Sequence, residues 1–139
     1  DPLQTTASFC SMVTHGRGVF SDQVDPLEVG RDWTNKVVRM ITRATEARER
    51  HDASHFLDVS YYDLMRDPLV QMERIYAFAG QPFDASTRAG IEASHESSPQ
   101  HRYGKHVYKL ESFGLEAEAL NARFATYRER FQIPREDRR

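Results

Sequence analysis

The chain has 139 residues, of which 39% are hydrophobic and 29% charged, and its formal net charge is -2. This composition is typical of one globular domain and excludes the strong positive field with which proteins attract nucleic acid or an anionic membrane. A single cysteine excludes an intrachain disulfide framework and a multi-cysteine zinc site, and it favours a reducing, cytoplasmic location. We therefore expect a small-molecule partner, no metal, no nucleic acid and, for lack of a long apolar run, no transmembrane segment.

Two capped helices are predicted first. Asp1 and Pro2 have the residue types of an N-cap and a first helical residue, and the apolar spacing behind them predicts a helix to about His15. Asp25, Pro26 and Glu28 form a second start signal, a capping box, for a long helix. The apolar stripe of this second helix consists of Val29, Trp33, Val37, Met40, Ile41 and Ala44.

A short strand and two more helices follow. The segment from Phe56 to Tyr61 is rich in residues that favour strands and lies between helical stretches, which predicts a strand of a parallel sheet. Asp67-Pro68 opens a helix that closes at Gly80. Asp84 predicts the cap of a further helix from residue 85 to about residue 94.

The last part of the chain combines a polar loop with one more helix. We expect the loop from Ser97 to Tyr108 and a helix that ends before Pro134. Residues 135–139 form a charged tail. The helix is predicted from apolar residues at steps of four, three and four, namely Leu120, Phe124, Tyr127 and Phe131.

One strand cannot form a sheet, so the fold class depends on what lies outside this chain. An isolated buried strand belongs more naturally to a larger α/β sheet than to an all-α domain. The chain also starts at Asp1 without a methionine. We therefore expect a mostly helical fragment with about one parallel strand, whose other strands lie upstream. Isolated, such a fragment is expected to self-associate through the open strand edge.

The first eleven residues, Asp1 to Ser11, carry a motif. They resemble the 3'-phosphate motif of bacterial sulfotransferases, in which an arginine and Asp/Asn-Pro precede a helix that bears a serine eight residues after the arginine. Ser8 matches that serine, and the arginine would stand immediately before Asp1. A hydroxyl and a guanidinium near the start of a helix suit a dianionic phosphate. The alternative is that Ser8 is an ordinary helical serine, either exposed or bonded back to the helix.

Two further segments are similar to the same family. Val59 to Pro68 resembles its Tyr-Glu-Asp-Leu stretch at a strand end, with Tyr61 at the position of the aromatic residue near the adenine and Tyr62 in place of the usual glutamate. The alternative is that Tyr61 packs in the core. The basic loop before Leu110 resembles the loop that covers the cofactor phosphate, and its candidate contacts are Arg102, Gly104 and Lys105.

The resemblance implies a P-loop-like three-layer α/β fold, with residues 1–139 as the C-terminal part of a single domain. It implies transfer of a sulfuryl group from 3'-phosphoadenosine 5'-phosphosulfate (PAPS) to an acceptor hydroxyl or amine, on a carbohydrate or a lipid. This chain would supply the 3'-phosphate and adenine side of the site. The catalytic residues and the 5'-phosphosulfate loop would lie upstream, so we expect little activity from these residues alone. The alternative function is a non-catalytic helical interaction domain derived from this fold.

Overall fold

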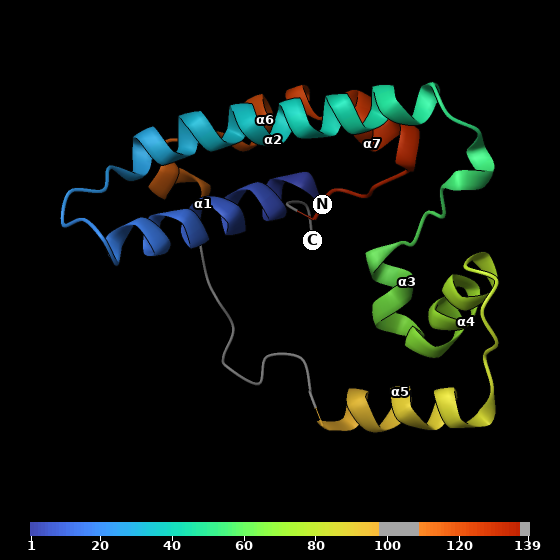
Figure 1. Cartoon of the computed structure of the whole chain (residues 1–139). Helices are drawn as coiled ribbons and strands as arrows, with labels where there is room; N and C mark the ends of the chain where they lie inside the picture. The colour runs from blue at the N-terminus through green and yellow to red at the C-terminus, as the bar shows by residue number, and fades with distance from the viewer. Residues whose placement is uncertain (98–108, 137–139) are drawn as a thin grey trace. The chain divides into compact units, whose positions relative to one another are not determined.

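The computed structural model describes residues 1–97 and 109–136, and the chain divides into two compact units (Figure 1). Unit 1 combines residues 1–49 with the C-terminal part of the chain, and unit 2 comprises residues from Arg50 onward in the middle of the sequence. The elements of unit 1 are α1 (Pro2–Gly18), α2 (Pro26–Glu49), the 3-10 helix η2 (Leu110–Phe113), α6 (Ala117–Arg123) and α7 (Ala125–Phe131). Those of unit 2 are η1 (Ala53–His55), α3 (Tyr61–Arg66), α4 (Pro68–Phe78) and α5 (Ala85–Ser97).

Helices α1 and α2 begin where the sequence predicts. The Asp1 carboxylate accepts a hydrogen bond from the Leu3 amide at 2.9 Å, and the Asp25 carboxylate accepts one from the Leu27 amide at 2.9 Å. Of the expected capping box of α2, only the hydrogen bond to the Asp25 carboxylate is present. The Glu28 side chain pairs with Arg17 of α1 at 3.5 Å instead. Helix α1 extends three residues past His15, since glycine permits a helix end without requiring one.

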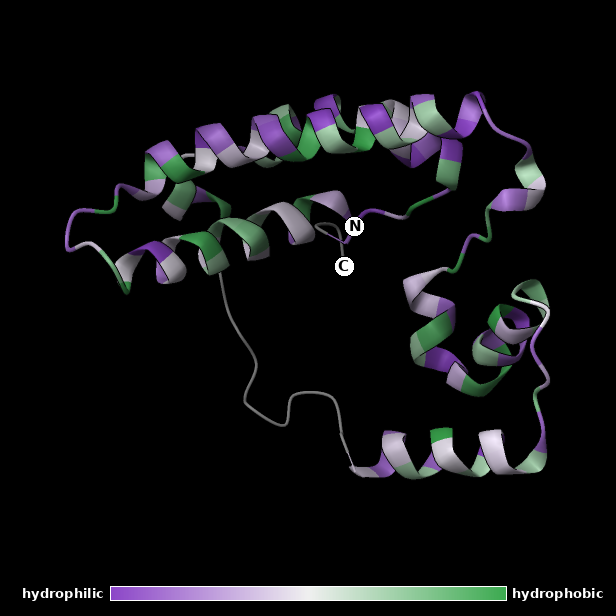
Figure 2. Ribbon diagram, in the orientation of Figure 1, coloured by the Kyte–Doolittle hydropathy of each residue, from purple (hydrophilic) through white to green (hydrophobic). Residues whose placement is uncertain are grey.

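The core of unit 1 lies where α1, α2, η2 and α6 meet. The predicted stripe of α2 supplies Val29 and Val37 to it, whereas Met40 is 59% exposed. Figure 2 shows hydrophilic residues along the outer side of α2. The buried apolar side chains form two clusters, Leu3, Val37, Leu120 and Phe124 in one and Cys10, Val29 and Phe113 in the other.

The single predicted C-terminal helix is divided into α6 and α7 at Phe124. The backbone of Phe124 has φ -104° and ψ 7°, outside the helical range, and its side chain is 1% exposed. The apolar spacing therefore identified the buried face correctly, with Leu120 and Phe124 in the core. It did not reveal the turn between the two short helices.

A buried ion pair joins the start of α1 to the end of α7. The Arg128 guanidinium donates a hydrogen bond to the Asp1 carboxylate, and both side chains are almost completely removed from solvent. The same carboxylate accepts a hydrogen bond from the Glu136 amide at 2.9 Å. The segment of residues 132–136 thus returns to the start of α1 (Figure 1), and the first residue of the predicted charged tail, Arg135, pairs with Glu118 at 2.7 Å.

The predicted strand at residues 56–61 is not formed in the described part of the chain, which corrects one element of the expected fold. The backbone is extended at Phe56 (φ -128°, ψ 132°) and at Ser60 (φ -70°, ψ 129°), as the strand-forming residue types favour. A strand needs a neighbouring strand for its ladder, however, and residues 1–97 and 109–136 contain none. Tyr61 is therefore the first residue of α3, and Ser60 caps that helix by accepting from the Asp63 amide at 3.4 Å.

Helices α4 and α5 of unit 2 begin at the predicted caps, and α4 closes at the predicted glycine. The Asp67 carboxylate caps α4 through the Val70 amide at 3.1 Å, and Asp84 caps α5 through the Thr87 amide at 2.8 Å. Gly80 has φ +65°, a left-handed conformation that glycine adopts without strain, and the Gln81 amide bonds back to the Tyr76 carbonyl at 2.9 Å. Helix α5 ends at Ser97, three residues beyond the predicted end.

Two helical glycines give a matched test of the packing. A Cβ added at Gly30 would lie 2.0 Å from the Phe113 carbonyl oxygen, whereas one at Gly16 meets nothing within 4 Å. We expect Gly30→Ala to destabilise the protein by about 1–3 kcal/mol through overpacking and Gly16→Ala to stabilise it by about 0.4–1 kcal/mol. Thermal and urea unfolding measure both. Equal stability of the two variants would contradict the close packing of α2 on η2.

Candidate functional site

Ser8 lies on α1, half-buried, seven residues after the N-cap Asp1. Three threonine hydroxyls of the same helix donate to the carbonyl oxygen four residues earlier. They belong to Thr5, Thr6 and Thr14, and the distances are 3.0, 2.7 and 2.9 Å. The Ser8 hydroxyl makes no such bond within residues 1–97 and 109–136. The back-bonded alternative for Ser8 is thus not what the described residues show, and its hydroxyl can donate to a ligand.

The N-terminus of α1 already holds a negative group. The Asp1 carboxylate is fully buried there and accepts the amides of Leu3 and Glu136 as well as the Arg128 guanidinium. A second anion close to this carboxylate would be repelled unless further cations were near it. An anion bound beside α1 therefore needs positive charge from outside the first turn of the helix.

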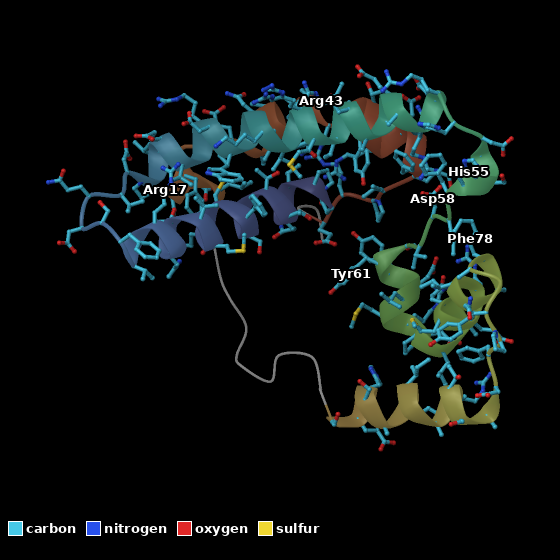
Figure 3. All side chains as sticks on the ribbon, in the orientation of Figure 1. Arg17, Arg43, His55, Asp58, Tyr61 and Phe78 are labelled. Atoms are coloured by element: carbon cyan, nitrogen blue, oxygen red, sulfur yellow. The ribbon has the colours of Figure 1, made fainter. Side chains whose placement is uncertain are left out.

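Tyr61 is an exposed residue of α3. Its side chain projects from the first turn of the helix (Figure 3) and the residue is 57% exposed, so Tyr61 is not part of the core. Its ring meets that of Tyr62 edge to face, with ring centroids 6.0 Å apart. The neighbouring carboxylates are structural, as expected, because Asp63 pairs with Arg66 at 2.5 Å and Asp67 caps α4. An exposed aromatic ring of this kind can pack on a planar base.

The other three candidate contacts, Arg102, Gly104 and Lys105, lie outside the described residues. Ser8 belongs to unit 1 and Tyr61 to unit 2, and each unit is described by itself. The candidate residues therefore stay assigned by their positions in the motifs. No described helix is long and apolar enough to cross a membrane, and no group of three described His, Cys, Asp or Glu side chains could hold a metal ion.

Two hollows lie at the connection between α1 and α2, with volumes of about 430 and 500 Å³. Their walls come from residues 14–28, among them Arg17 and Phe20 for the first hollow and His15 and Asp22 for the second. Ser8 is in neither. These two hollows thus do not coincide with the motif residue, as is expected when only one wall of a site lies on α1.

Arg128 is the residue near the motif that the sequence did not reveal. It lies 127 positions from Asp1, and its Nη1 atom also donates to the Pro134 carbonyl at 2.9 Å. One signal was present, because Arg128 follows Phe124 by four residues and so falls on the buried face of the C-terminal helices. An arginine on an apolar face indicates a buried partner.

Cys10 lies on α1 in the core, with 0% exposure, beside Val29 and Phe113. Burial raises the pKa of the Cys10 thiol above its ordinary value. Because the thiolate is the nucleophile, a raised pKa and a buried sulfur both make the thiol inert. Cys10 is therefore a packing residue and takes no part in the candidate site.

Comparison with known proteins gives two matches. A model of the sulfotransferase family matches residues 1–85. The crystal structure of a sulfotransferase, STF9 from Mycobacterium avium, superposes with a TM-score of 0.85 at 33% sequence identity and covers 98% of this chain. The chain spans 35% of the length of that protein. No curated protein sequence matches the chain.

The burial of Cys10 gives a direct test of the unit 1 core. We expect the folded thiol to react with a disulfide reagent at least about tenfold more slowly than the thiol of the urea-unfolded protein, since its thiolate fraction and its access are both reduced. Raising the pH should speed the reaction of the unfolded protein first, because its thiol ionises at the lower pKa. A native protein that reacted at the unfolded rate would show that the Cys10 cluster is open.

Proposed function

The chain belongs to the sulfotransferase family, and we propose that the protein transfers a sulfuryl group from PAPS to an acceptor hydroxyl or amine. The likeness to the mycobacterial sulfotransferase confirms the expected P-loop-like α/β parent fold. The proposal assigns this chain the side of the site that holds the 3'-phosphate and the adenine. The acceptor is proposed to be a small molecule with a carbohydrate or lipid skeleton.

The proposal that this chain binds the nucleotide part of PAPS rests on one observation. Ser8 stands at the motif position of the family's phosphate-binding serine, on a helix that starts with Asp1-Pro2 as the motif requires. Its hydroxyl is not bonded within the described residues, while the threonines around it are. A hydroxyl without an internal partner can donate to a phosphate oxygen at no cost in lost helix contacts.

The remaining candidate residues fit the same ligand by their chemistry. PAPS supplies the activated sulfuryl group, and the protein has to bind and orient it. The exposed ring of Tyr61 suits the flat face of adenine. Because the Asp1 carboxylate occupies the start of α1, the charge of the 3'-phosphate has to be balanced by cations. The arginine expected before Asp1 and the loop residues Arg102 and Lys105 are the proposed sources.

A second candidate function is favoured by exposed apolar side chains near the connection of α1 and α2. Val19 and Phe20, between α1 and α2, are 75% and 90% exposed, and Leu27 at the start of α2 is 57% exposed. Large exposed apolar side chains are the kind of residue that interaction surfaces use. A helical interaction domain would keep these side chains exposed and would show no preference for nucleotides with a 3'-phosphate.

The Ser8 assignment is testable in the full-length gene product. We expect Ser8→Ala to weaken binding of adenosine 3',5'-bisphosphate by about 1.5–3 kcal/mol, the range for a hydrogen bond to a charged group, as measured by calorimetry. Thr14→Ala on the same helix is the control, because the Thr14 hydroxyl bonds to the Cys10 carbonyl and should not touch the nucleotide. If Ser8→Ala bound as tightly as the unchanged protein, Ser8 would be an ordinary helix residue. A protein without any affinity for the nucleotide would favour the interaction domain.

A further inference from the structure

We propose that Arg128 is a positioning residue for the 3'-phosphate site, acting through Asp1 from the C-terminal end of the chain. The inference rests on the proposed function and deepens it. Arg128 does not have to touch the nucleotide in this role. It holds the backbone from which the phosphate-binding groups project.

Several hydrogen bonds hold the Asp1 carboxylate and the two Nη atoms of Arg128. Asp1 Oδ1 accepts from the Leu3 amide at 2.9 Å and from Arg128 Nη2, and Oδ2 accepts from the Glu136 amide at 2.9 Å. Arg128 Nη1 donates to the carbonyls of Ile133 and Pro134 at 3.4 and 2.9 Å. The Asp1 side chain is 0% exposed and that of Arg128 is 9% exposed. A charged pair so completely buried has little freedom to shift without losing several hydrogen bonds.

The position of this network in the chain connects it to the proposed site. In the family motif, an arginine stands immediately before the aspartate that Asp1 matches. Asp1 also starts α1, and Ser8 follows seven residues later, about 10 Å along a rigid helix. The two proposed phosphate contacts, the arginine expected before Asp1 and Ser8, are therefore both connected through the backbone to Asp1, which Arg128 holds in place. A small displacement of Asp1 would move the two contacts relative to each other.

Arginine suits this position better than lysine. The guanidinium offers donors in a fixed planar fork, and here two of its nitrogens serve a carboxylate on one side and two carbonyls on the other. A lysine ammonium at the end of a flexible stem could keep the charge but could not satisfy the carboxylate and both carbonyls in the same geometry. A conservative change at residue 128 should therefore separate the role of charge from that of position.

The test measures preference for the 3'-phosphate as well as affinity. In the full-length gene product, the dissociation constants of adenosine 3',5'-bisphosphate and adenosine 5'-monophosphate are compared by calorimetry. We expect Arg128→Met to reduce the preference for the bisphosphate by about tenfold or more and to leave the affinity for the monophosphate unchanged. A displacement of about 1 Å in a group that contacts the 3'-phosphate is enough for a loss of this size. Arg128→Lys should retain an intermediate preference.

Arg130→Met is the matched control. Arg130 lies two residues further on α7, and its pair with Glu49 at 2.5 Å is exposed, so its loss should leave the preference unchanged. Circular dichroism checks that each variant folds, and if Arg128→Met does not, Arg128→Lys supplies the result.

The outcomes separate the two proposals. An unchanged preference in a folded Arg128 variant, or an equal loss for both nucleotides, overturns the positioning role alone. A wild-type protein that binds the two nucleotides equally overturns the proposed function, whatever the Arg128 variants do. A loss of preference confined to the Arg128 variants supports both.

Discussion

The buried pair of Asp1 and Arg128 is the interaction on which unit 1 depends. Removing two charges from water costs several kcal/mol for each ion, and hydrogen bonds to both groups offset part of that cost. Here the carboxylate has amide and guanidinium donors and the guanidinium has carbonyl acceptors. The pair joins residues 127 positions apart, so the start of α1 and the segment after α7 take their places together.

The apolar core and this polar network support each other. Leu3, two residues from Asp1, packs with Leu120 and Phe124, and Arg128 follows Phe124 by one helical turn. The break between α6 and α7 occurs at Phe124 itself, whose ring is fully buried. Packing therefore excludes water from the ion pair, and the ion pair determines where the packed helices begin and end.

The Asp1 carboxylate also limits which ligands can bind at the N-terminus of α1. A free helix N-terminus attracts anions, but in this protein a side chain of the helix already occupies that position. Under the proposed function, nucleotide binding beside α1 would rely on side-chain hydroxyls and on cations from other parts of the protein.

The sequence by itself determined where α1, α2, α4 and α5 begin and which residues cap them, because each signal acts within one or two turns. Asp1, Asp25, Asp67 and Asp84 cap helices as predicted, whereas the roles of Ser8 and Tyr61 stay predictions from local motifs. Only the tertiary structure decided the features that need distant partners. Phe56 and Ser60 have extended backbones without forming a strand, since a ladder requires another strand. The partner of Asp1 is Arg128 because folding, and no spacing in the sequence, brings the ends of unit 1 together.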